Sequence, residues 1–280
     1  MVFLTFLGMF TNQYVPIWMK DNEDKHMNQV IGQLSALKSG IDMQTLSSNS
    51  MVASAPIYSP IQLHADGVPI FASPTMGELS FTGAKASGGA STSLNYSYVA
   101  DGTSHYINNV TGASTGGSLE FYGPNRYFVQ QSVIYENGAV ILNQSDGEVV
   151  LAGISIKITQ SGSSNMVLIT LTSLMGDDKT VGGFGTKSVT TAVDYSSYTK
   201  VENISGSQLT VAIISEHGVA WGKYFETVLD NTGMDQSLWS VGRSGPSSTG
   251  YYSVTVKIEN VVSLEFTKAV ASVAIADIGV

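Results

Sequence analysis

The chain has 280 residues, of which 43% are hydrophobic and only 12% are charged, about half the charged share of an average globular domain. The length suits one large domain or two small ones, and intrinsic disorder is excluded because it requires low hydrophobicity and high net charge. The net charge of −9 repels phosphate backbones, so we expect no nucleic-acid partner.

Cysteine is absent, which excludes disulfides, thiolate metal sites and a cysteine nucleophile. Serine, threonine, asparagine and glycine together supply 103 residues. This composition is typical of short strands joined by many turns, or of a surface that packs against copies of itself.

The first nineteen residues are mainly apolar, but Thr11-Asn12-Gln13 interrupts them after ten residues. The segment has neither the basic start nor the small-residue cleavage site of a secretory signal. It is shorter than the roughly 20 apolar residues that a spanning helix needs. Two interpretations remain: a buried first element, or the lower end of a longer hydrophobic helix that is trimmed at its first residues.

An amphipathic helix is predicted after Lys20, since apolar residues recur there at steps of three and four on one helical face. These residues are Met27, Val30, Ile31, Leu34, Leu37 and Ile41. If both segments form one helix, Pro16 removes a backbone hydrogen bond. We therefore expect a kink or local melting between Thr11 and Pro16, and a helix that ends near residue 43.

From about residue 44 the hydrophobic period becomes two, which predicts half-buried strands. Alternation is clear in 77–82, 94–98, 153–158, 167–171 and 252–258. Asn137-Gly138 predicts a two-residue hairpin turn between strands near 127–136 and 139–143, because both residues tolerate positive φ.

Two further elements complete the expected fold. Residues 218–229 predict one short helix that ends at Asn231-Thr232-Gly233, and 261–280 predict one or two buried strands. The fold class is therefore mainly β: an N-terminal hydrophobic and amphipathic α-helix (residues 1–45), followed by an antiparallel β-sandwich head with one short extra helix (residues 46–280).

Candidate catalytic and metal sites are weak in this sequence. Residues 112–116 match the nucleophile pattern G-x-S-x-G around Ser114, but a buried strand before it and a helix after it are not predicted. Asp177-Asp178 indicates a solvated turn that lacks the calcium-loop pattern. The histidines lie far apart and have no partner at metal-ligand spacing: His26, His64, His105 and His217. We expect no enzymatic activity and no cofactor.

Four sequons for N-linked glycans occur, about as many as chance predicts. They are Asn95, Asn109, Asn143 and Asn203. Asn109 and Asn143 lie beside predicted turns, where glycans on an extracellular surface would fit.

Several short phrases resemble archaeal type IV pilin-like surface proteins. In the N-terminal region they are residues 14–23, His26-Met27 and residues 33–42; further along the chain they are residues 67–71, 119–127 and 135–142. The resemblance implies an extracellular subunit whose leader is removed by a prepilin-type peptidase, and whose hydrophobic helix rests in the membrane before assembly and in the filament core afterwards. The sequence departs from this pattern because it shows no basic leader and its apolar stretch before Thr11 is short.

The function that this resemblance implies is a structural subunit of an extracellular pilus-like filament on the cell surface, with copies of itself as partners. The assembly residues expected from the apolar segment are Val2, Phe3, Leu4, Phe6, Leu7, Met9, Phe10, Ile17 and Trp18. We expect these to be buried between subunits and not within their own head. The alternatives are a membrane-tethered, non-polymeric adhesin or glycan-binding β-sandwich, and a secreted hydrolase.

Overall fold

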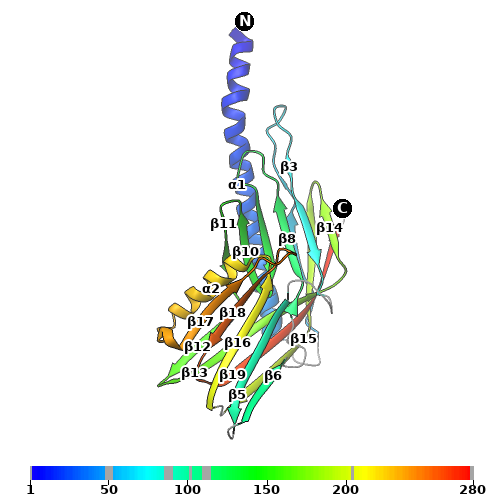
Figure 1. The fold of residues 1–280 in the computed structure, drawn as a ribbon. Helices are drawn as coiled ribbons and strands as arrows, with labels where there is room; N and C mark the ends of the chain where they lie inside the picture. Colours follow the sequence, from blue (N-terminus) through cyan, green and yellow to red (C-terminus); the bar gives the residue numbers. More distant parts are fainter. Residues whose placement is uncertain are drawn as a thin grey trace.

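The computed structural model describes residues 2–47, 53–84, 91–100, 103–108, 115–202 and 205–277. Within these ranges the chain is mainly β, with one long helix at its start and one shorter helix (Figure 1). The helical elements are α1 (Val2–Ser47), α2 (Gly218–Asp230) and the short 3-10 helix η1 (Gln236–Leu238). The prediction of a mainly β chain with an N-terminal helix and an additional helix is confirmed.

Helix α1 is continuous through Pro16, so the predicted local melting near this residue is wrong. The Thr11 hydroxyl donates to the carbonyl oxygens of Leu7, at 2.9 Å, and of Gly8, at 3.2 Å. The helix also ends at Ser47, four residues later than expected. Its last turn is held by Gln44, whose buried amide donates to the carbonyl oxygens of Ala55 and Thr191.

The strands form three large sheets and one small one. The central sheet has the order β1 (Ile57–Gln62), β15 (Thr186–Glu202), β19 (Val261–Asp277), β13 (Ser164–Met175), β12 (Ser155–Ser161). The hairpin sheet has the order β11 (Gly147–Ala152), β10 (Ala139–Gln144), β9 (Gln131–Glu136), β8 (Ser118–Gly123), β4 (Glu78–Thr82), β14 (Lys179–Gly182). The outer sheet has the order β17 (Trp239–Ser244), β18 (Tyr252–Ile258), β16 (Ser205–Ser215), β5 (Ser91–Ala100), β6 (Thr103–Asn108), with β7 (Thr115–Gly116) paired to β5. The small sheet joins β2 (His64–Ala65) to β3 (Thr75–Met76).

Strand pairing in the described residues is antiparallel except between β13 and β19, which run parallel. The predicted alternating segments fall in β4, β5, β12, β13 and β18. The C-terminal segment forms the single long strand β19.

Two hydrophobic cores lie within the head. The α1 core joins the amphipathic face of α1 to the central and hairpin sheets. Five of the six predicted residues, Met27, Val30, Leu34, Leu37 and Ile41, are buried in it, and Ile31 is half-buried against it. The α2 core joins α2 to strands of all three large sheets. Strand β9 separates the cores, since Val133 and Tyr135 face the α1 core and Ile134 faces the α2 core.

The long strands of the central sheet connect the two cores through opposite faces. In β19, Leu264 and Phe266 face the α2 core, whereas Ala269 and Ala271 face the α1 core. Its neighbour β15 changes face at a bulge at Asp194, because one extra residue moves every following side chain to the other side of a sheet. The Ser272 hydroxyl bonds to the Asp194 carboxylate at 3.2 Å.

The Asn137-Gly138 hairpin is confirmed. Asn137 has φ 52° and Gly138 φ 92°, and the turn joins β9 to β10 with Glu136 paired to Ala139. Strand β9 begins at Gln131, four residues later than predicted. The preceding residues, 124–130, are not extended because they fold around a carboxylate of α1.

That carboxylate belongs to Glu23, which is fully buried. Its two oxygens accept hydrogen bonds from the backbone amides of residues 126, 127 and 128, at 3.0, 2.8 and 2.7 Å. The Thr75 hydroxyl donates a fourth bond of 2.6 Å. Such bonds offset the cost of burying a charge, which is several kcal/mol without partners. Glu23 thereby fastens α1 to β3 and to the segment before β9.

Replacing Gly138 by Val should destabilise the head by about 1–3 kcal/mol, since a left-handed φ strains any residue with a β-carbon. The new Cβ would also lie 3.4 Å from the Thr172 hydroxyl. Thermal unfolding measures the effect. Gly182→Val is the matched control, because Gly182 lies in a strand without positive φ, and its melting temperature should stay close to that of the parent. Equal melting temperatures for both variants would contradict the turn.

Glu23→Gln should lower the free energy of unfolding by about 2–3 kcal/mol, because the amide nitrogen cannot accept the backbone bonds and leaves buried donors unpaired. Chemical denaturation checks this value. Asp21→Asn, an exposed change on the same helix, should be neutral; a Glu23 variant as stable as this control would show that the carboxylate does not hold α1.

Candidate functional site

The sequence motif for a nucleophile cannot be placed, because Ser114 lies outside the described residues. Thr115 and Gly116 form β7 and pair with β5. The Thr115 hydroxyl donates to the side-chain oxygen of Asn137 at 2.8 Å. The described end of this motif therefore serves the hairpin turn.

The histidines with described side chains occupy separate positions. His26 is buried against the Phe121 ring, and its Nε2 lies 2.9 Å from the Gln62 carbonyl oxygen. Burial lowers its pKa. The Nδ1 of His64 accepts from the amide of Gly185 at 3.1 Å. Among the described residues, no group of three or more His, Asp or Glu side chains is placed to hold a metal ion.

A buried polar cluster fixes the start of α2. The Glu136 carboxylate is fully buried and accepts from the Ser215 hydroxyl at 2.5 Å and from the Trp221 indole nitrogen at 2.6 Å. Burial raises its pKa. Sequence inspection missed this group, because strand β9 reads as apolar and its partners are about 80 residues away.

The second carboxylate of this cluster caps α2. Glu148 accepts from the amides of Val219 and Ala220, at 2.7 and 2.9 Å, and lies 3.1 Å from the His217 Nδ1. Burial alone would raise the pKa of Glu148, but the bonds from His217 and from the helix amides outweigh it and lower the pKa. Burial opposes the charge on His217, yet the bond to Glu148 and the charges of Glu136 and Glu148 raise its pKa. These contacts anchor a helix and open onto no described cavity.

The potential glycosylation sites are only partly described. Asn109 and Asn203 lie outside the described residues, and Asn95 lies in β5. Asn143 is half-buried in β10, two residues before a turn. Asp178, from the predicted solvated turn, accepts from the amide of Gly83 at 2.9 Å.

The strongest candidate site is the N-terminal half of α1, which projects beyond the sheets (Figure 1). Large apolar side chains there are exposed to solvent, and the segment carries no charged side chain before Lys20. The exposed fractions are Phe3 72%, Phe6 62%, Ile17 58%, Met9 51%, Tyr14 50% and Trp18 44%. Of the remaining expected assembly residues, Leu7 and Phe10 are half-buried, and only the helical backbone is described for Val2 and Leu4.

Most of these side chains share one side of α1, here called the aromatic face: Phe3, Phe6, Phe10, Tyr14, Ile17 and Trp18. Residues 6, 10, 14 and 18 follow at steps of four, which places them in one row. The Phe10 ring lies 6.4 Å from Phe6, 5.9 Å from Tyr14 and 5.4 Å from Trp18. Residues 3, 7, 10, 14 and 17 also follow the 4-3-4-3 spacing of a coiled-coil seam. This spacing was visible in the sequence and would have added Tyr14 to the expected residues.

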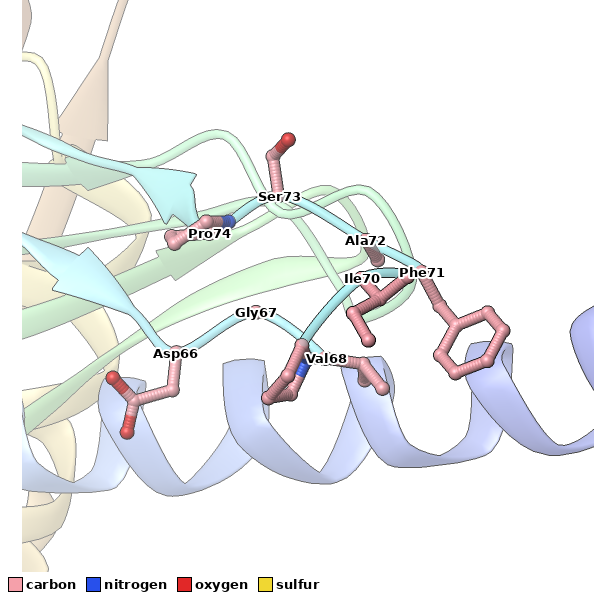
Figure 2. A pocket seen from close by; sticks show the side chains of 9 residues that line it. Asp66, Gly67, Val68, Ile70, Phe71, Ala72, Ser73 and Pro74 are labelled. Atoms are coloured by element: carbon pink, nitrogen blue, oxygen red, sulfur yellow. The ribbon is translucent and has the colours of Figure 1, made fainter.

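A second element flanks this half of α1. The loop of residues 66–74, between β2 and β3, runs alongside the helix and lines a shallow surface hollow (Figure 2). Val68 packs against Val15 and Met19, with Phe10 and Ala72 beside them. The Phe71 ring lies 5.1 Å from the Phe10 ring. Phe10 therefore contacts its own head, so the expectation of contacts between subunits alone is wrong for this residue.

The end of the 66–74 loop carries an unusual residue. Ile70 has φ 71° and its side chain is fully exposed. A β-branched residue is a steric outlier in this region, which costs about 1–3 kcal/mol. The turn at the end of the loop is formed by Pro69, Ile70 and Phe71. No sequence signal separates an exposed Ile in such a turn from a buried one.

Among the described residues, no helix contains an apolar stretch long enough to cross a membrane. Comparisons with protein-family models, curated proteins and solved structures found no match to this chain.

The buried cluster makes the stability of the α2 region depend on pH. Glu148, with its lowered pKa, stabilises the fold above its ordinary value of 4.5, and this contribution is lost as pH falls through the folded-state pKa. His217, with its raised pKa, stabilises below 6.5, and its contribution is lost as pH rises through the folded-state pKa. The folded-state pKa of Glu136 is raised, so this residue destabilises the fold increasingly as the pH rises above its ordinary pKa.

Glu148→Gln should therefore cost about 1 kcal/mol, the usual value of a helix N-cap, between pH 5 and 6.5, and much less at pH 3. Melting temperatures across this range test the expectation. Glu226→Gln, on the exposed side of α2, should leave the profile unchanged. If Glu148→Gln lowered the melting temperature by the same amount at every pH, the role assigned to the Glu148 charge would be refuted.

Proposed function

We propose that this chain is the structural subunit of an extracellular, pilus-like filament, and that it polymerises through the aromatic face of α1. The observation that carries the proposal is the exposure of several large apolar side chains on a helix that projects from the head. Contiguous apolar surface of this kind is typical of protein or membrane contacts. The short phrases that resemble archaeal type IV pilin-like proteins support the same assignment.

The energetics favour association between copies. Removing a large apolar side chain from water contributes about 1.5–3 kcal/mol, so burial of even three from each subunit offsets a substantial part of the entropy lost on association. When the same pair of non-identical surfaces is repeated by a screw operation, the result is an open filament.

The lower half of α1 suits a rigid connection between head and filament. Its apolar face is occupied by the α1 core and Glu23 is fastened to the head. The upper half is thus held in a fixed direction as one continuous helix. A force applied to the upper half would pass directly into the central and hairpin sheets.

We further propose that the head is a β-sandwich. Supporting this, strands from the central and outer sheets contribute to one shared hydrophobic core with α2. The low charge of the chain and its many Ser, Thr and Asn residues suit a head surface that packs against neighbouring heads, or that carries glycans. In this proposal the apolar segment of α1 contacts the membrane before assembly.

Phe6→Lys should abolish assembly while the head stays folded, because Phe6 is 62% exposed on the projecting half of α1 and a lysine would be buried unpaired between subunits. Sedimentation and electron microscopy measure assembly, and thermal unfolding measures the head. Leu46→Lys is the matched control: it lies on the same helix, is 88% exposed and changes the charge equally.

The control should assemble as the parent does. Filaments formed equally by both variants would overturn the assignment of the aromatic face. A parent chain that stays monomeric at all concentrations would overturn the filament and favour a non-polymeric adhesin.

A further inference from the structure

We infer that the end of the 66–74 loop, formed by Ile70 and Phe71, is a second half of the assembly site and receives the aromatic face of α1 from a neighbouring copy. This inference rests on the proposed self-association and names the surface that pairs with α1.

Hydrogen bonds hold the two arms of the loop together and fix the loop to α1. The amides of residues 68 and 72 each donate to the other's carbonyl oxygen, at 3.0 and 2.9 Å. The Asn22 side chain of α1 donates to the Asp66 carbonyl oxygen at 3.0 Å. A Cβ on Gly67 would lie 2.3 Å from the Ala72 carbonyl oxygen, so the two arms of the loop are in close contact. The position of Ile70 follows from this support.

Burial within its own chain does not offset the backbone strain at Ile70. Its positive φ is strained for a β-branched side chain, and Gly or Asn would relieve that strain. The side chain makes no compensating burial, since it is fully exposed. A strained and solvent-exposed apolar residue is explained by a contact with a second molecule.

The contact that the loop already makes indicates which kind of surface it would bind. Phe71 lies against Phe10 of its own aromatic face, so the loop end is complementary to that kind of surface. The loop carries no charge beyond Asp66, and α1 carries none before Lys20, so neither surface selects a charged partner. The aromatic face of a second copy offers this chemistry, and Ile70 would contact it as Phe71 contacts Phe10.

The geometry is also suitable, because the loop sits beside residues 10–19 of α1 (Figure 2). If helices of neighbouring copies lie side by side, the loop of one is level with the aromatic face of the next. The contact therefore needs no rearrangement of the head.

The absence of cysteine permits a direct test in the full-length chain. Two single-cysteine proteins are mixed under assembly conditions and treated with a short bis-maleimide: Ser73→Cys, exposed beside the loop end, and Gln13→Cys, exposed beside the aromatic face. Both changes leave Ile70 and the aromatic side chains intact. A cross-link between the two proteins is expected. Ser73→Cys mixed with Leu46→Cys, at the far end of α1, should give none.

The second measurement uses Ile70→Gly and Ile70→Asn, which fit the positive φ. Both should melt at the same or a higher temperature than the parent, yet raise the critical concentration for assembly about tenfold or more, the effect of losing one buried apolar side chain. Leu46→Ala should leave the critical concentration unchanged.

The outcomes separate the two proposals. If the parent assembles but the Ile70 variants assemble equally well and no cross-link forms, the inference about the loop is overturned and the role of α1 stands. If the parent and Phe6→Lys are both monomeric, the proposed function fails and the inference fails with it.

Discussion

A single buried carboxylate determines how the long helix is joined to the rest of the protein. Glu23 lies at the point where α1 enters the head, and its oxygens accept four hydrogen bonds from β3 and from the segment before β9. A buried charge is tolerated only when its hydrogen-bonding capacity is satisfied. The helix can therefore take one axial position and one rotation. With that rotation set, Met27 to Ile41 face the α1 core and the aromatic face points to solvent.

This constraint divides α1 into two halves with different partners. Below Glu23, apolar side chains are buried between the central and hairpin sheets; above it, the 66–74 loop packs against the helix. The loop packs on Val15, Met19 and Phe10 and leaves most of the aromatic face exposed, including Phe3, Phe6 and Ile17. The same arrangement that stabilises the head thus presents an uncharged apolar surface outside it, which is the surface on which the proposed self-association rests.

Buried carboxylates also attach the second helix, α2, to the head. Glu136 and Glu148 on neighbouring parts of the hairpin sheet hold Ser215, His217 and the first turn of α2. Carboxylates at a helix N-terminus interact favourably with its dipole. The attachment of α2 therefore accounts for these buried acid and histidine residues.

The local elements of this protein are determined by the sequence. Hydrophobic periods identify α1, α2 and the alternating strands, and Asn137-Gly138 specifies its turn, because these features depend on neighbouring residues. The apolar stretch at the N-terminus is likewise visible in the sequence, and it is the basis of the proposed assembly segment. Tertiary structure alone decided the continuity of α1 through Pro16, the late start of β9 around Glu23, and the exposure of Ile70. The late start of β9 depends on contacts between residues distant in sequence, Glu23 with Thr75 and Phe128, and no local pattern encodes which distant group will satisfy a buried charge.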